Sequence, residues 1–155
     1  MRIRTFAVAV AVLAVIATSS YAQNPVGVWK VNIAKSKYSP GPAPKSSTIT
    51  TTAVADGSFR SINETVPATG ATTKSDVTYK FDGKDNKATG NPNADTQAYT
   101  RDDDRHWTVV SKKGGKVTLT TKIELAADGK SRTSTQTGTD AQGRAVNNFI
   151  VYEKQ

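Results

Sequence analysis

The chain contains no cysteine and a single histidine, His106, and these two scarcities exclude several classes of function. Without cysteine there is no disulfide, no thiol nucleophile, no Cys-ligated zinc, no iron–sulfur cluster and no cysteine to carry a bacterial lipoprotein anchor. With one histidine, a single chain cannot build a multi-histidine metal site or a mechanism that uses two histidines. We therefore expect neither a metal nor a cofactor.

Long apolar runs are also scarce, and the one clear example, Phe6 to Ala17, lies near the N-terminus. Arg2 and Arg4 precede it, and the small residues Ser20 and Ala22 follow at the two positions that a signal peptidase reads. The run is shorter than the roughly 20 residues that a membrane-spanning helix needs. We predict that residues 1–22 are a signal peptide, cleaved after Ala22, with an uncleaved N-terminal anchor as the alternative. The remaining 23–155 form one domain, periplasmic or secreted, with no stable membrane insertion after cleavage.

Acidic residues are the minority, with 13 Asp and Glu against 21 Lys and Arg, for a formal charge of +8. Two of these positive charges, Arg2 and Arg4, belong to the predicted leader. The others are dispersed beside turns, whereas a nucleic-acid site gathers basic residues on one face, often with stacking aromatics. We expect no nucleic-acid partner.

Threonine, serine and valine dominate what is present, and they alternate with a period of two. Between Gly115 and Leu125 the residues Val117, Leu119, Thr121 and Ile123 share one side, which is typical of a half-buried strand. Glycine-containing turns recur about every ten residues, the rhythm of a sandwich or barrel. The pattern predicts about ten strands: Gly27–Asn32, Ser46–Val54, Ser58–Val66, Thr72–Phe81, Asp85–Thr89, Asp95–Arg101, Arg105–Lys112, Lys116–Leu125, Ser131–Gly138 and Ala145–Glu153.

Tight turns pair sequence neighbours as antiparallel strands, so the predicted fold is an all-β, up-and-down meander. A meander this long leaves two adhesive edges unless it closes, which favours a single antiparallel β-barrel of about 8–10 strands. The segment 33–45 is the exception to the tight turns. Its first residues, 33–38, are expected to form one or two helical turns, and its proline-rich part, 39–44, to run extended. It serves either as a crossover between strands or as a lid over one mouth of the barrel.

The first strand carries Gly27-Val28-Trp29, a Gly-x-Trp shortly after the predicted leader, and a Pro-rich segment ending at Lys45 follows it. With the meander, and with the stretches Gly90–Asp95 and Val146–Asn148, this resembles the lipocalin-like (calycin) barrels, in particular small secreted bacterial members of unassigned function. The resemblance implies that Trp29 closes one barrel end, often under an arginine from a later strand. Lys154 is the nearest cation to the end of the last strand, and Arg101 or Arg144 are substitutes. The resemblance also implies binding of a small, largely apolar molecule.

Candidate chemistry outside the interior is weak. His106 shares a strand face with Thr108 and Val110, opposite Trp107, so we expect it to face solvent rather than to act as a catalyst. Asp102, Asp103 and Asp104 are consecutive, whereas calcium loops space their acids at alternate positions, and we interpret them as a solvated turn.

The predicted inward faces combine a few aromatic side chains with many hydroxyls. The strand Ser131–Gly138 has no large apolar residue on either face. Small polar residues cannot fill a barrel, which predicts a cavity that holds water or ligand; an open, two-sided edge strand is the alternative. The residues expected to line this cavity and bind the ligand are Trp29, Tyr79, Phe81, Trp107 and Phe149.

The sequence therefore predicts a non-catalytic binding protein for a small apolar or amphipathic ligand, in which aromatic rings supply contact area and hydroxyls orient the ligand. The alternative is a periplasmic inhibitor of a secreted protease, which would insert its N-terminal residues 23–26 into the enzyme's cleft.

Overall fold

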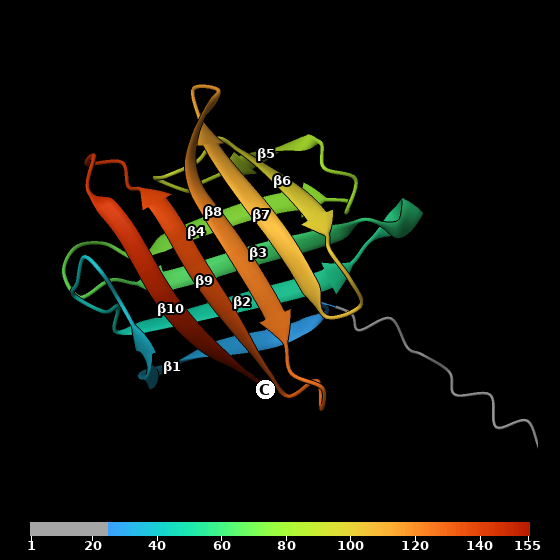
Figure 1. Ribbon diagram of the computed structural model, residues 1–155, viewed down its shortest axis with the longest axis horizontal. Helices are drawn as coiled ribbons and strands as arrows, with labels where there is room; N and C mark the ends of the chain where they lie inside the picture. The colour runs from blue at the N-terminus through green and yellow to red at the C-terminus, as the bar shows by residue number, and fades with distance from the viewer. Residues whose placement is uncertain (1–24) are drawn as a thin grey trace, which may run out of the picture.

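The computed structural model describes residues 25–155, and these form one closed antiparallel β-barrel (Figure 1). The predicted signal peptide, residues 1–22, lies outside the described residues. Ten strands follow one another with no crossover, and a single 3-10 turn, η1, interrupts them. The elements are β1 Gly27–Lys37, β2 Ser46–Ala53, η1 Ala55–Gly57, β3 Phe59–Val66, β4 Thr73–Tyr79, β5 Asp85–Thr89, β6 Thr96–Arg101, β7 His106–Lys113, β8 Lys116–Leu125, β9 Ser131–Thr139 and β10 Ala145–Lys154.

The barrel closes because β1 pairs with both β2 and β10. Trp29 lies opposite Lys154 in one ladder and opposite Ile49 in the other. The first and last strands of the meander thus pair with each other, so the sheet has no open edge to which another chain could add. The prediction of an all-β, up-and-down antiparallel barrel is confirmed, and nine of the predicted strands agree with the observed ones to within a residue or two.

The predicted helical turn at residues 33–38 is wrong, because β1 continues to Lys37. An irregularity between Asn32 and Lys37 interrupts the β1–β10 ladder. Side chains replace the missing ladder bonds: Ser36 Oγ donates to the Asn32 carbonyl at 2.6 Å and accepts from the Val151 N–H at 3.0 Å. These bonds hold the chain extended, and β1 pairs with β10 again at Lys37.

The front half of the barrel, β7 to β10, crosses the rear half, β1 to β4, at a steep angle in Figure 1. Between the halves lies β5, which has only five residues. It pairs with β4 at two positions alone, Asp76 with Thr89 and Val77 with Ala88. The seam between β4 and β5 is therefore the most weakly bonded junction of the described sheet.

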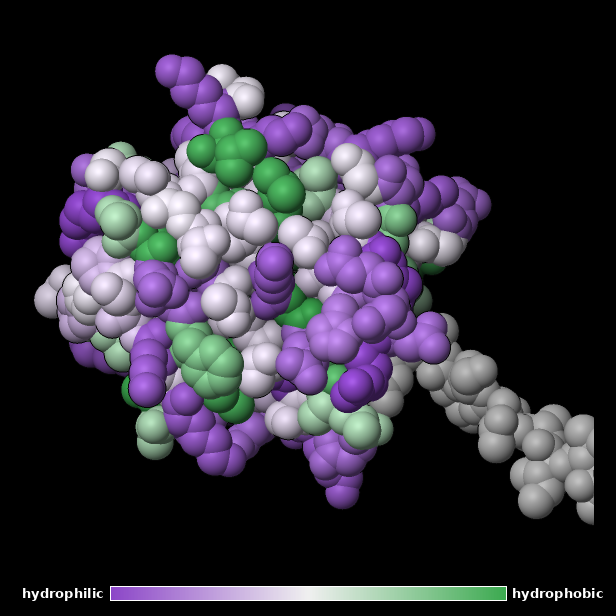
Figure 2. All heavy atoms as spheres, in the orientation of Figure 1, coloured by the Kyte–Doolittle hydropathy of each residue, from purple (hydrophilic) through white to green (hydrophobic). Residues whose placement is uncertain are grey.

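The outer surface is polar. In Figure 2 hydrophilic and neutral residues cover the visible face, and apolar residues appear on it as small, separate patches. The large exposed hydrophobic residues are Val28, Val54, Val117 and Phe149. Within residues 25–155 there is no helix of the length and apolarity needed to cross a bilayer.

One close backbone contact allows a sharp test of the register. Gly138 in β9 has φ +142°, and a Cβ atom there would lie 2.0 Å from the Thr118 carbonyl oxygen of β8. We expect Gly138→Ala to lower the free energy of unfolding by about 2–4 kcal/mol, because backbone rather than a flexible side chain must move. Urea titration measures this value.

The matched control is Gly143→Ala in the β9–β10 turn. Gly143 also has a positive φ, +78°, but its Cβ would meet no atom within 4 Å. The expected loss is about 1–2 kcal/mol, from backbone strain alone. Equal losses at the two positions would contradict the close β8–β9 approach.

Candidate ligand-binding cavity

One end of the barrel is closed by stacked rings, which we call the aromatic end. Tyr79 and Tyr99 are parallel with centroids 3.6 Å apart, and Phe81 meets Tyr79 edge-on at 5.5 Å. Trp107 in turn contacts Phe81 edge-on at 6.2 Å. Offset and edge-to-face pairs of this kind add to the stabilisation from burial. The rings of the aromatic end are Trp29, Phe59, Tyr79, Phe81, Tyr99, Trp107 and Tyr152.

A buried cation completes this end. The guanidinium of Arg132, from β9, lies 4.7 Å from the Trp29 ring centroid and 5.3 Å from that of Tyr152. Lys154 adds its ammonium 5.3 Å from Trp29, whose indole N–H donates to the Pro25 carbonyl at 2.9 Å. The tryptophan under an arginine that the resemblance implied is therefore present, but the arginine is Arg132 and not Arg101 or Arg144. Arg101 instead stacks on Phe81 at 4.3 Å.

Arg132 has unusual electrostatics. It is 4 % exposed, and its Nε has no hydrogen-bond partner among the described residues. Burial lowers the pKa of this guanidinium from its usual value, and the neighbouring tyrosines oppose the shift. Burial also raises the pKa of Tyr79, to about 12, and raises the pKa values of Tyr99 and Tyr152. At neutral pH the tyrosines of the aromatic end are uncharged, and Arg132 is the buried cation that lies against its rings.

Above the aromatic end the barrel encloses a cavity of about 370 Å³. Its wall changes character along several strands. From the aromatic end toward the opposite end, β9 lines the cavity with Arg132, Ser134 and Gln136, and β3 lines it with Ser61 and Asn63, which follow Phe59 of the aromatic end. β4 and β7 place an aliphatic residue between an aromatic and a polar one, as in Tyr79, Val77 and Ser75, whereas on β8 the polar Thr121 lies between Ile123 and Leu119.

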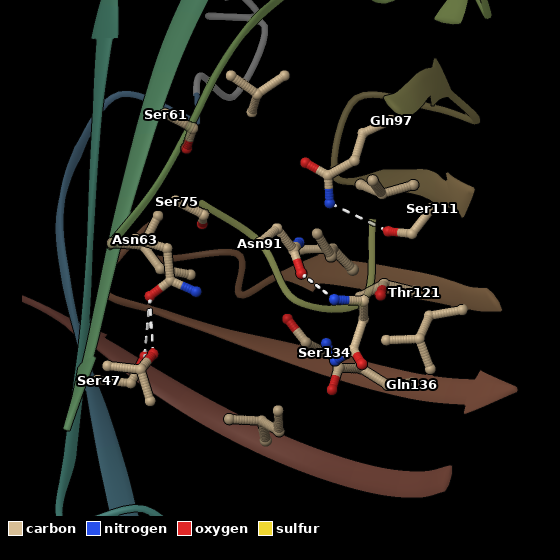
Figure 3. Close-up of a pocket in the computed structure, with 18 of the residues that line it drawn as sticks. Ser47, Ser61, Asn63, Ser75, Asn91, Gln97, Ser111, Thr121, Ser134 and Gln136 are labelled. Carbon is tan, nitrogen blue, oxygen red and sulfur yellow. Dashed lines mark hydrogen bonds between the residues drawn. The ribbon is translucent and has the colours of Figure 1, made fainter. Parts of the chain in front are cut away.

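The polar part of the wall forms a ring of neutral side chains, which we call the polar band. Ten of its members are labelled in Figure 3 and come from seven strands and the β5–β6 turn. They are Ser47, Ser61, Asn63, Ser75, Asn91, Gln97, Ser111, Thr121, Ser134 and Gln136.

Hydrogen bonds within the wall fix the amides of the polar band. Asn63 Oδ1 accepts from Ser47 Oγ at 3.0 Å, and Gln97 Nε2 donates to Ser111 Oγ at 3.0 Å (Figure 3). Gln136 Oε1 accepts from Asn148 Nδ2 at 3.1 Å. These contacts orient each amide before any ligand arrives.

Two segments border the mouth, the end of the cavity opposite the aromatic end. Tyr38 and Pro44 of the β1–β2 segment line the cavity, and so does the β5–β6 turn, residues 90–93. The β1–β2 segment is tied to β10, because the Ser39 N–H donates to Asn148 Oδ1 at 2.9 Å and the Asn147 N–H donates to the Ser39 carbonyl at 2.7 Å. The segment thus connects β1 with β2 and borders the mouth.

The five residues predicted to bind ligand have different positions. Tyr79 and Trp107 line the cavity. Trp29 is fully buried at the aromatic end but does not line the cavity, and Phe81 packs behind the lining rings. The prediction that Phe149 points inward is wrong: it is 42 % exposed, because β10 turns the neighbouring Ile150 and Tyr152 inward instead.

Sequence reasoning missed most of the polar band, together with Tyr99, Arg132 and Tyr152. The period of two predicts that Arg132, Ser134 and Gln136 share one face of β9, so these three residues could be grouped from the sequence. With serine and threonine on both faces, nothing in that strand shows which face is inward.

His106 lies outside the cavity, as predicted, with its Nδ1 2.7 Å from the carboxylate of Asp103 on the surface. The backbone N–H of Arg105 and the imidazole lower the pKa of Asp103. Over residues 25–155 no cluster of three or more His, Asp or Glu side chains is placed to hold a metal.

No family model matches the chain, and a search of curated proteins finds no match. Among solved structures, the chain is similar to the crystal structure of the wild-type fluorescent protein UnaG, with a TM-score of 0.54 over 84 % of this chain and 96 % of that one. The crystal structure of an asparagine-to-alanine mutant of UnaG is similar to the chain with a TM-score of 0.55, over 84 % of this chain and 95 % of that one. Both are 17 % identical to the chain, so the likeness shows the fold alone: a lipocalin-like or fatty-acid-binding-protein-like barrel.

The charge of Arg132 can be tested for its net effect on stability. A desolvated cation–π contact contributes about 2 kcal/mol, whereas burying a cation without a counter-ion costs several kcal/mol. We therefore expect Arg132→Met, which keeps the volume, to leave the free energy of unfolding unchanged or to raise it by about 1 kcal/mol. Lys154→Met is the exposed control and should change it by less than about 0.5 kcal/mol. If urea titration shows that Arg132→Met lowers the free energy of unfolding by more than about 2 kcal/mol while Lys154→Met does not, the charge of Arg132 stabilises the fold.

The buried tyrosines predict alkaline destabilisation. An unfolded tyrosine ionises near pH 10, whereas burial raises the pKa of Tyr79 to about 12 in the folded state. The stabilising contribution is therefore complete below about pH 10 and is lost as the pH rises toward about 12. Urea titrations across this range, with tyrosinate absorbance as a second signal, should show the free energy of unfolding falling. A constant value would mean that the tyrosines ionise freely in the folded barrel.

Proposed function

We propose that the protein, after export, binds a small amphipathic molecule in the barrel cavity and carries out no chemistry on it. The observation that carries this proposal is that the wall has aromatic rings at one end and neutral polar groups toward the mouth, with aliphatic residues between them on β4 and β7. A ligand with one apolar and one polar part matches this order when its apolar part points to the aromatic end.

The dimensions support a small molecule. Ligand pockets in proteins measure roughly 300–1,000 Å³ and combine apolar contact area with a few oriented polar groups. The cavity of about 370 Å³ lies at the lower end of this range. Tyr79, Tyr99 and Trp107 supply flat contact area, and the fixed amides of the polar band supply orientation.

The composition of the wall favours binding over catalysis. Arg132 is the one charged side chain among the described lining residues, which contain no carboxylate and no histidine. General acid–base catalysis near neutral pH needs a group that titrates there. Hydroxyls without a neighbouring base are poor nucleophiles, and no base lies beside those of the cavity.

The periplasmic or secreted location and the cleavage after Ala22 belong to this proposal, supported by the sequence of residues 1–22. We favour binding over protease inhibition because Pro25, within the segment 23–26, is fully buried and accepts the hydrogen bond of Trp29.

The two tryptophans give a direct test, because Trp107 lines the cavity and Trp29 does not. Residues 23–155 are titrated with Nile red, an uncharged apolar dye, while tryptophan fluorescence is recorded, and native mass spectrometry follows incubation with a lipid extract. We expect saturable quenching that persists in Trp29→Phe and disappears in Trp107→Phe, together with one retained molecule per chain.

A folded protein whose fluorescence is unaffected, and whose mass shows no retained molecule, would disprove ligand binding. Quenching that survives in Trp107→Phe and is lost in Trp29→Phe would place the dye outside the cavity.

A further inference from the structure

The polar band carries no charged side chain on any of the seven strands that contribute to it. Its hydroxyls and amides face one another across the cavity from β2, β3, β4, β6, β7, β8 and β9 (Figure 3). The surface of the same barrel is rich in charge, with ion pairs such as Lys112 with Asp85 at 2.8 Å. The absence of charge from the polar band is therefore a property of this part of the described interior and not of the composition of the chain.

Part of the hydrogen-bonding capacity of this band is unused. In Figure 3 no dashed line ends on Ser75, Thr121 or Ser134, and within residues 25–155 their hydroxyls have no protein partner. The amides of Asn63 and Gln136 use their oxygens within the wall, which leaves their NH₂ groups for the cavity. The band thus offers donors and hydroxyl oxygens together, on opposite walls.

Such groups bind either water or a ligand that reproduces the hydrogen bonds of water. A purely apolar ligand at this height displaces ordered water and leaves Thr121 and Ser134, which are 9 % and 4 % exposed, unsatisfied. An ionic head group loses its hydration and meets no opposite charge in the band, at a cost well above that of a neutral polar group.

The one cation of the wall does not change this balance. The guanidinium of Arg132 is stacked against Trp29 and Tyr152, and its unpaired Nε is buried away from the cavity surface. It lies at the aromatic end, below the polar band, where it also disfavours a cationic ligand.

We propose that the polar part of the ligand is uncharged and carries several hydroxyl groups, so that the cavity accepts a neutral, sugar-like amphiphile such as an alkyl glycoside. This inference rests on the proposed function and makes it more specific. Each ligand hydroxyl can donate and accept, which is the combination that the free hydroxyls and NH₂ groups of the band require.

Three amphiphiles with the same tail and different head groups test the proposal: octyl glucoside, octanoate and octyltrimethylammonium, each used below its micellar concentration. Affinities are measured on residues 23–155 by competition against Nile red and by calorimetry. We expect octyl glucoside to bind at least tenfold more tightly than either ion. Tighter binding of octanoate would overturn the neutral head group while the proposed function stands, since a small amphiphile is still bound in the cavity.

A matched pair of double variants locates the head group. Thr121→Val with Ser134→Ala removes two inward hydroxyls, and we expect it to weaken octyl glucoside about tenfold or more while changing octanoate less than about twofold. Thr120→Val with Thr135→Val makes the same kind of change one residue away in β8 and β9, on the opposite face of the sheet, and should change neither affinity. Equal effects of the two double variants would overturn the proposed placement.

If none of the three amphiphiles and no dye binds to the folded protein, the proposed function itself fails. That result differs from a preference for octanoate, which refutes the neutral head group alone. Circular dichroism of each variant establishes that it is folded before its affinity is interpreted.

Discussion

Ten strands enclose more space than the inward side chains of this chain can fill, and the rest of the structure depends on this constraint. A barrel of eight strands is just wide enough for side chains to fill it. Here the sheet closes with ten, and many inward positions carry serine, threonine or asparagine rather than leucine or phenylalanine. An internal cavity therefore follows from closure itself, and the chain controls only where the cavity lies and what its wall presents.

The aromatic rings determine where the cavity lies. They gather at one end because each of several strands places its largest inward residue there, as β4 does with Tyr79 and β7 with Trp107. Stacking with Arg132 and Tyr152 makes that end solid around Trp29, which is completely buried. The free volume is displaced toward the other end, where Tyr38 and the β5–β6 turn border it. The asymmetry gives any ligand a defined direction.

Much of the fold was predictable, because alternation and glycine turns are local signals. The misplaced Phe149 shows the limit: in β10 the apolar residues Phe149 and Val151 alternate with Ile150 and Tyr152, so both faces are apolar and only pairing in the barrel selects one. The expected helix at 33–38 failed for a related reason, since the bonds of Ser36 reach across to β10. The cavity was predictable from an excess of small polar residues. The positions of aromatic and polar residues along its wall could be known only from the register of all ten strands.

The weak seam between β4 and β5 has a consequence for the dynamics of the barrel. Only two residue pairs join these strands, whereas β9 and β10 are paired along nearly their whole length. Local opening is favoured where the fewest bonds must break, so we expect the amide hydrogens of β5 to exchange with solvent through fluctuations smaller than global unfolding. A local opening at this seam would give water a route to the interior other than the mouth, with the remaining strand pairs intact.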